Sequence, residues 1–167
     1  MTETVVITGI ARTPMGAFKG AFEDVAAPEL GAVAIKAAMS EANIDASAVE
    51  QVVMGCVLPA GQGQAPARQA ALGADLPMAT GAVTVNKMCG SGMQAAIMAH
   101  DTIKAGSADI IVAGGMENMT RAPYLLPDAR NGMRMGDKAV IDSMMHDGLT
   151  DAYDGGAMGV FADMIAA

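Results

Sequence analysis

Four short runs of apolar and β-branched residues, separated by helix-like segments, most constrain what this chain can fold into. The runs are Val5–Ile10, Val49–Leu58, Ala82–Val85 and Asp109–Gly114, and each has the length and composition of a buried strand. Parallel strands need long crossover connections, usually helices, because a short turn cannot reverse the chain twice. The alternation therefore predicts an α/β fold, with a mostly parallel sheet flanked by helices and right-handed crossovers.

Three helices are predicted between these runs. Residues 28–44 repeat apolar side chains at helical spacing, and Pro28 suits a first helical turn. A shorter helix within residues 65–77 is expected to stop near Gly73. The third follows residue 90 and is expected to end near residue 106, with one apolar face formed by Met93, Ala96, Ile97, His100 and Ile103.

The character of the sequence changes at Thr120. The segment beyond it is dense in Gly, Asp, Met and Arg and predicts a long excursion from the sheet, with Asn131-Gly132 typical of a two-residue hairpin turn. An apolar helical pattern begins in "AMGVFADMIAA" and stops without a capping residue, so we expect the chain to be cut there. We predict two parts, residues 1–119 as an incomplete N-terminal domain and residues 120–167 as the beginning of a loop domain.

Composition excludes several classes of function. The chain is 52% hydrophobic and 17% charged, which favours a packed globular interior. Its net charge of −8 and aromatic content of 3% argue against a nucleic-acid partner or an anionic membrane surface. Without a signal-peptide pattern or an 18-residue apolar stretch, we expect a cytoplasmic protein with no membrane partner. Cys56 and Cys89 fit no metal-ligand spacing, so we expect reduced thiols and no metal.

One of these two cysteines has an unusual setting. In "VNKMCGSGMQAA", residues 85–96, Cys89 lies where a strand is expected to end and a helix to begin. Unpaired N–H groups and the positive end of the helix dipole stabilise a thiolate and an oxyanion there. Gly90 and Gly92 permit a sharp turn and the close approach of an acyl group. The pattern indicates a nucleophile, while a buried cysteine acting as a small hydrophobe explains it equally well.

The longer stretch "VNKMCGSGMQAAIMAHDTI" resembles the acyl-enzyme signature of the thiolases. "GGMENMTRAPYLLP", "GCVLPAGQGQAPARQAAL" and "ARTPMGAFKGAF" resemble other segments of that family, and the resemblance runs from Val5 to Ala166. Within the family the chain is most similar to the short-chain acetyl-CoA acetyltransferases, which make or cleave acetoacetyl-CoA. The resemblance implies a thiolase-like fold and acyl-CoA substrates, with CoA as a substrate and no metal or redox cofactor.

The resemblance also assigns roles to single residues. It implies that Cys89 carries the acyl group as a thioester, and that Met158 lies against the acyl-pantetheine arm. We expect Gly90 and Met88, on either side of the cysteine, to bind substrate, although methionine is more often a core residue. Ala157 stands where many short-chain members have histidine, which leaves the acyl-chain length open.

Thiolases are more than twice as long as this chain. Their second half brings a histidine in a Gly-His-Pro setting and a cysteine in a Cys-x-Gly setting, and this sequence contains neither motif. We expect His100 to have a packing or surface role, His146 to be a solvated loop residue and Cys56 to be a buried structural thiol.

The segment after residue 119 is locally basic. Residues 120–138 carry a charge of +2, four cations minus two anions: Arg121, Arg130, Arg134 and Lys138 against Asp128 and Asp137. A solvated loop accounts for this pattern. The resemblance implies a cationic surface near the CoA phosphates, or a contact within a homo-oligomer built as a dimer of dimers.

Three functions remain open. The first is thiolase-type acyl transfer between a 3-ketoacyl-CoA, expected to be acetoacetyl-CoA, and CoA through Cys89. The second is a non-catalytic fragment that only folds or assembles. The third is another condensing enzyme of the same fold, such as a ketoacyl or hydroxymethylglutaryl-CoA synthase. "NKMCGSGMQA" and "GGMENM" favour the thiolase.

Overall fold

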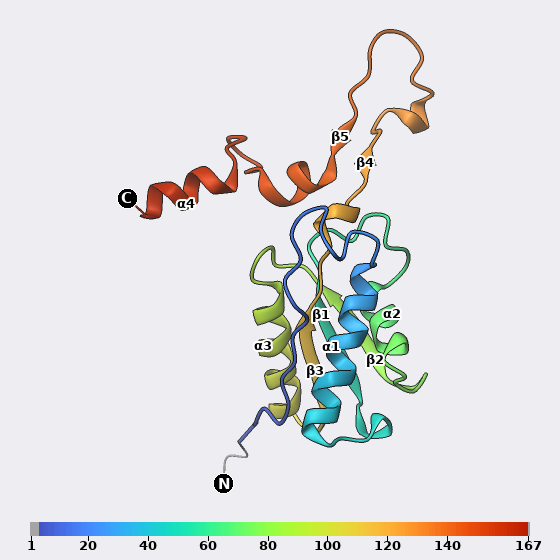
Figure 1. The fold of residues 1–167 in the computed structure, drawn as a ribbon, viewed down its shortest axis with the longest axis vertical. Coiled ribbons are helices and arrows are strands. Elements are labelled where there is room, and N and C mark those ends of the chain that lie inside the picture. Colours follow the sequence, from blue (N-terminus) through green and yellow to red (C-terminus); the bar gives the residue numbers. More distant parts are fainter. Residues whose placement is uncertain (1–3, 167) are drawn as a thin grey trace.

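A parallel sheet organises the computed structural model, which describes residues 4–166 (Figure 1). Its three strands are β1 (Gln51–Gly55), β2 (Gly81–Val85) and β3 (Ile111–Gly115), in the spatial order β2-β1-β3. β1 pairs in parallel with both neighbours along its whole length. The predicted α/β fold with a parallel sheet is confirmed, and three of the four predicted strands are present. β1 is shorter than predicted, β2 begins one residue earlier, and β3 is shifted toward the C-terminus.

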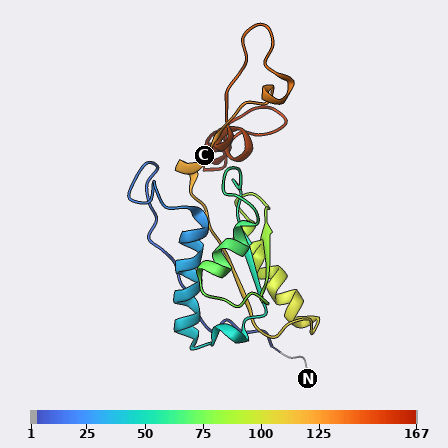
Figure 2. The same cartoon turned by 90° about the vertical axis from the view of Figure 1, so that its right-hand side faces the viewer.

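Helices cover both faces of this sheet. α1 (Ala27–Ala42) and α2 (Pro66–Gly73) lie on one face, and α3 (Ser91–Lys104) lies on the other (Figure 2). Pro28 lies in the first turn of α1, as predicted, since its missing N–H group has no partner to lose there. All three predicted helices are therefore confirmed, with ends close to the expected ones.

The main hydrophobic core lies between the sheet and the pair α1 and α2. Val52 and Met54 of β1 enter it, and because side chains alternate along a strand, Val53 points toward α3. The remaining core residues are mostly alanines, which let the helices approach the sheet closely: Ala27, Ala32, Ile35, Val49, Ala67, Ala70, Ala71, Ala74, Leu76 and Met116.

The face of α3 that packs on the sheet is not the predicted one. Its buried residues are the small Ser91, Ala95 and Ala99. A Cβ placed on Gly55 of β1 would lie 2.7 Å from the Cβ of Ser91, so the helix is too close for larger side chains. Residue size, not hydropathy, selects the packed face, and the predicted face is turned outward, exposed or half-buried: Met93, Ala96, Ile97, His100 and Ile103.

The prediction of a strand at Val5–Ile10 is wrong. This segment is extended and mostly exposed, and within residues 4–166 it pairs with no strand. It runs along α1 instead: the N–H group of Ile10 donates to the Glu41 carboxylate (2.7 Å), and a Cβ on Gly9 would collide with the carbonyl oxygen of Ala38. β-branched composition favours an extended chain, but only a neighbouring strand makes it part of a sheet.

After β3 the chain leaves the sheet, as predicted, and extends beyond its carboxyl end (Figure 1). β4 (Tyr124–Leu125) and β5 (Ile141–Asp142) form an antiparallel pair. α4 (Met158–Ala166) confirms the helical pattern expected near the end of the sequence. The short remaining helices are the 3-10 segments Ala46–Ala48, Met119–Arg121 and Ala129–Asn131 and the π-helical segment Met144–Leu149.

Two details of this excursion differ from the prediction. Asn131 ends a 3-10 helix and Gly132 takes the left-handed conformation (φ 86°), so they lie within a long connection, residues 126–140, and not in a two-residue hairpin turn. The π-helical segment Met144–Leu149 was not predicted, because its sequence shows no repeat of apolar residues at helical spacing. Across residues 4–166, the helices are too short or too polar to cross a membrane.

Gly55→Ala tests the close approach of α3 to β1. The new Cβ would lie 2.7 Å from two atoms of Ser91 and 2.8 Å from the backbone nitrogen of Gly92, so backbone would have to move. We expect the free energy of unfolding to fall by about 1–3 kcal/mol, measured by urea denaturation.

The matched control is Gly81→Ala in β2 of the same sheet. Its Cβ would have its nearest contact at 3.6 Å, which is ordinary van der Waals distance. We expect this substitution to change the free energy of unfolding by less than about 0.5 kcal/mol. Equal losses in the two variants would show that the approach of α3 is not the limiting contact.

Candidate active site

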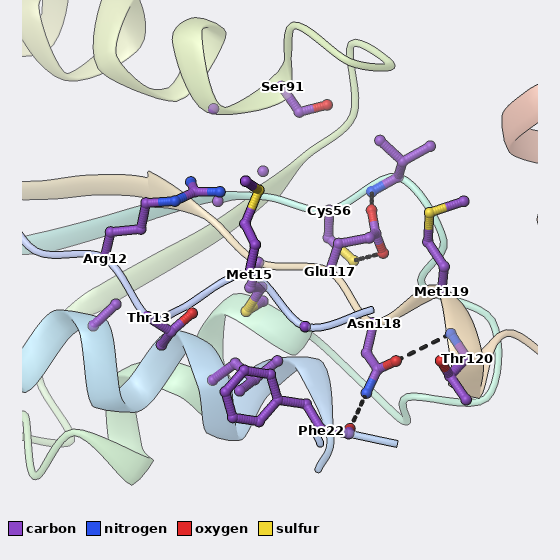
Figure 3. A pocket seen from close by; sticks show the side chains of 18 of the residues that line it. Arg12, Thr13, Met15, Phe22, Cys56, Ser91, Glu117, Asn118, Met119 and Thr120 are labelled. Atoms are coloured by element: carbon purple, nitrogen blue, oxygen red, sulfur yellow. Dashed lines mark hydrogen bonds between the residues drawn. The ribbon is translucent and has the colours of Figure 1, made fainter. Parts of the chain in front are cut away.

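The carboxyl ends of the three parallel strands meet at a cavity of about 1000 Å³. This edge is where ligands commonly bind in open parallel sheets, because the loops there diverge and leave a crevice. Cys56 follows β1, Cys89 follows β2 and Glu117 follows β3, and all three line the cavity. The N-terminal segment closes it from the opposite side with side chains such as Arg12 and Phe22 (Figure 3).

Cys89 lies in the tight turn between β2 and α3. Met88, just before it, has φ 48°, a left-handed conformation that is unfavourable for any residue with a Cβ. The N–H group of Gly90 donates to the carbonyl of Lys87 (3.1 Å), and that of Ser91 to the carbonyl of Met88 (3.0 Å). The Ser91 hydroxyl accepts from the Lys87 N–H group (2.9 Å) and donates to the Met88 carbonyl (2.5 Å). The expected strand-to-helix turn is therefore present and fixed.

The two thiols of the cavity differ in exposure. Cys89 is exposed and Cys56 is buried, and neither forms a disulfide. An exposed thiol beside the N-terminus of a helix can act as a nucleophile, whereas a buried one is normally inert. The burial predicted for Cys56 is confirmed, and the nucleophilic role of Cys89 stays a prediction.

The other predicted site residues are distributed unevenly. Met88 lines the cavity beside Cys89, and Gly90 is the residue that precedes α3. Met158 begins α4 and is not among the residues that line the cavity. Its contact with the acyl-CoA, like those of Met88 and Gly90, stays a prediction.

The π-helical segment of the excursion reaches the cavity, although no sequence pattern indicated this. Met144 and Leu149, at the two ends of the π-helical segment, line it from above the sheet edge. A π-helix has a different side-chain period from an α-helix, so hydrophobic periodicity could not identify them. π-Helical turns are frequent at functional sites, which supports a role for this segment.

Cys56 is held by two polar side chains. Its thiol donates to Glu117 Oε1 (3.6 Å) and accepts from the Gln62 amide (3.4 Å). Burial, followed by the negative charge of Glu117, raises the pKa of Cys56 to about 11, against a smaller lowering by Gln62. At pH 8 only about one Cys56 side chain in a thousand is ionised, so this cysteine is a poor nucleophile.

Glu117 also anchors the loop that follows β1. Its carboxylate accepts hydrogen bonds from the backbone N–H groups of Val57 (2.7 Å; Figure 3) and Leu58 (3.3 Å). Glu117 lies within "GGMENM", where no sequence pattern predicted this role. An acid two residues after the end of β3 was the available signal, because a carboxylate at a strand end needs donors close by.

The residues after Glu117 fasten the N-terminal segment across the cavity. The Asn118 amide donates to the carbonyls of Phe22 (Figure 3) and Val25, both at 2.7 Å. The Thr120 hydroxyl oxygen accepts from the N–H group of Lys19 (2.9 Å). Because these bonds link positions about a hundred residues apart, no local sequence pattern could predict them.

Neither histidine lies at the cavity. His100 is exposed on α3, and its Nδ1 lies 2.9 Å from the carboxylate of Asp101. His146 is exposed in the π-helical segment. The surface role considered for His100 is confirmed and the packing role is wrong, because the helix packs through its other face.

The chain has a parallel α/β sheet and an exposed cysteine at a strand-to-helix turn beside a cavity. These features place it among α/β proteins with a candidate cysteine nucleophile. Sequence comparison identifies the family: the chain matches the thiolase N-terminal domain over residues 5–167. The chain belongs to the thiolase family.

Curated relatives agree with this assignment. Acetyl-CoA acetyltransferase of Cupriavidus necator is 50% identical over 99% of this chain and 42% of its own length. Acetyl-CoA acetyltransferase 1 of Arabidopsis thaliana is 48% identical over 97% of the chain and 39% of its own length. The probable acetyl-CoA acetyltransferase of Escherichia coli is 46% identical over 97% and 41%. The chain thus spans about two fifths of the length of these relatives.

Thiol alkylation tests the contrast between the two cysteines. At pH 8, iodoacetamide should label the exposed Cys89 and leave Cys56 unlabelled until the protein is unfolded, as measured by peptide mass spectrometry. Equal labelling of both thiols in the folded protein would contradict the assigned environments.

Glu117→Gln should move the labelling of Cys56 to lower pH. The substitution removes the negative charge that opposes formation of the Cys56 thiolate, so the pKa of Cys56 should fall from about 11 while burial still keeps it raised. Glu23→Gln, at an exposed position, is the matched control and should leave the pH midpoint unchanged. A higher plateau rate with an unchanged midpoint would indicate loosening of the loop and not an electrostatic effect.

Proposed function

We propose that this chain supplies the acyl-accepting cysteine of a thiolase-type acyltransferase. The observation that carries the proposal is the exposed Cys89 at the N-terminal end of α3, beside a large cavity, in a member of the thiolase family. The names of the curated relatives support acetyl-CoA chemistry, and acetoacetyl-CoA is the substrate we propose.

In this reaction the Cys89 sulfur attacks the 3-keto carbonyl carbon of the substrate. The bond between C2 and C3 then breaks, and the electron pair stays on C2, which takes up a proton to give acetyl-CoA. The thiol of a second CoA attacks the Cys89 thioester, takes the acyl group and releases the cysteine. The positive end of the helix dipole at the N-terminus of α3 stabilises the oxyanion formed in each step.

This mechanism needs an acid and a base as well as a nucleophile. Within residues 4–166 both histidines lie away from the cavity, and the carboxylate of Glu117 already accepts bonds from Cys56, Val57 and Leu58. We therefore expect residues 1–167 alone to cleave no acetoacetyl-CoA. The test of the proposal therefore uses a chain in which residues 1–167 are joined to the remaining sequence of a relative.

A chimaera makes this test. Residues 1–167 replace the matching N-terminal part of the Cupriavidus necator relative, with which they share 50% identity. The chimaera should consume acetoacetyl-CoA when CoA is added, and Cys89→Ser should reduce that rate at least about a thousandfold, because a neutral hydroxyl is a far weaker nucleophile. After exposure to acetyl-CoA, mass spectrometry should find the acetyl group on the Cys89 peptide.

Cys56→Ser is the matched control in the same chimaera. It keeps a hydrogen-bond donor toward Glu117 and should leave the rate within about threefold. An acetyl group on Cys56, or full activity of Cys89→Ser, would contradict the proposal. A folded chimaera without acetylation would favour the alternative of a non-catalytic chain.

Several finer assignments follow from this proposal. Met88 and Gly90 bind the acyl-CoA substrate beside Cys89, Met158 lies against its acyl-pantetheine arm, and CoA is a substrate, not a resident cofactor. The position of Met88 on the cavity wall supports its part in this. Two free thiols, one of them exposed, suit a reducing compartment, so we place the activity in the cytoplasm. The acetyl-CoA chemistry named for the relatives is the support for placing it in fatty acid metabolism.

We propose further that the protein is a dimer of dimers joined through residues 126–140. The β4–β5 hairpin that carries this loop stands away from the sheet, and its Met135 is 90% exposed (Figure 1). Deleting residues 131–138 should leave dimers in sedimentation velocity, and Met135→Asp should have the same effect.

Tyr153→Asp is the control for this prediction, because Tyr153 is 99% exposed and lies outside the loop. It should leave the tetramer intact. Tetramers that survive the loop deletion would rule this loop out as the contact between dimers.

A further inference from the structure

Asn86 connects the ends of two strands directly beside the cysteine turn. It follows β2, and its amide Nδ2 donates to the carbonyl of Val57 in the loop after β1 (3.1 Å). Its Oδ1 accepts from the backbone N–H group of Met88 (2.9 Å). The side chain therefore uses its donor and its acceptor on two different backbone segments.

The second of these bonds acts on the strained residue of the turn. Met88 has φ 48°, and this left-handed conformation is energetically unfavourable for a residue with a Cβ. Asn86 holds the N–H group of Met88, while Ser91 holds its carbonyl through both the backbone and the hydroxyl. Both peptide groups of Met88 are thus fixed, and Cys89 is the next residue in the chain.

The first bond ties this arrangement to the rest of the sheet. The N–H group of Val57 lies 2.7 Å from Glu117 Oε2, so the segment that Asn86 grips is itself anchored at the end of β3. A continuous path of hydrogen bonds, Glu117 to Val57 to Asn86 to Met88, therefore joins the Cys89 turn to the carboxyl ends of all three strands.

We propose that Asn86 is a positioning residue for Cys89: it keeps Met88 left-handed and thereby aims the thiol into the cavity. Asn86 is not among the residues that line the cavity, so it acts through Met88 and not on the substrate. This inference rests on the proposed function, because the position of the thiol matters if Cys89 accepts the acyl group.

The experiment measures single-turnover acetylation of Cys89 by acetyl-CoA with quenched-flow mass spectrometry, on the full chain within the chimaera. Asn86→Ala removes both bonds and should lower the acetylation rate at saturating acetyl-CoA about tenfold to a hundredfold, as expected when a reacting group is misplaced. The half-saturating acetyl-CoA concentration should change less than about threefold, because Asn86 does not line the cavity.

Thr80→Ala is the matched control for a merely structural effect. Thr80 precedes β2 at its other end, is buried, and donates its hydroxyl to the carbonyl of Val49 (2.9 Å). Both alanine variants should lower the melting temperature, but only Asn86→Ala should slow acetylation. If both slow it equally, or if neither does, the positioning role is overturned.

Met88→Gly supplies a rescue, since glycine adopts positive φ without steric cost. In the Met88→Gly background, Asn86→Ala should cost at least about threefold less in acetylation rate than it does in the wild type. If Asn86→Ala slows acetylation as much in the Met88→Gly background as in the wild type, the proposal is overturned.

Met88→Val provides an independent variant if Asn86→Ala does not fold. A β-branched side chain resists the left-handed conformation more strongly than methionine does, so acetylation should slow although Asn86 is intact. An unchanged rate in Met88→Val would overturn the proposal. A wild-type chimaera that takes up no acetyl group would overturn the proposed function and this inference together, whereas equal rates for wild type and Asn86→Ala would overturn this inference alone.

Discussion

The close contact between the start of α3 and the end of β1, the central strand, is the constraint on which the rest of the structure depends. It requires glycine at position 55 and small residues on the packed face of the helix, because Ser91 and Gly92 lie directly over the strand. This closeness places the N-terminus of α3 at the sheet edge, and with it the exposed thiol of Cys89. The same contact therefore sets the packing of α3 and the position of the Cys89 thiol, and a larger side chain there would displace both.

The cavity contains two cysteines that differ in their exposure and in their polar neighbours. Cys56 is buried and faces a carboxylate, and both factors favour its neutral thiol. Cys89 is exposed at the positive end of a helix. Glu117 acts on both cysteines. Its charge disfavours ionisation of Cys56, and its carboxylate anchors the backbone segment that Asn86 connects to the turn of Cys89.

The strand-to-helix turn at Cys89 was predictable because glycines and a change from β-branched to small residues mark it locally. The parallel sheet followed from the alternation of strands and helices. The extended Val5–Ile10 was mistaken for a strand because composition does not reveal whether a partner lies alongside. The packed face of α3 was also missed, since it is set by the proximity of Gly55 and not by hydropathy. The roles of Asn86 and Glu117 arise from backbone segments brought together only by the fold.

The strand order β2-β1-β3 has a consequence for the time course of folding. Asn86 meets a partner 29 positions away, whereas Glu117 reaches Cys56 across 61 positions. Closing the longer loop costs more chain entropy, and topologies rich in distant pairings fold slowly. The β1–β2 pair should therefore form before β3 docks, and the cysteine turn should acquire its final anchor last. Newly made chains would then pass through a stage in which α3 exists but the turn that holds the Cys89 thiol still lacks its final anchor.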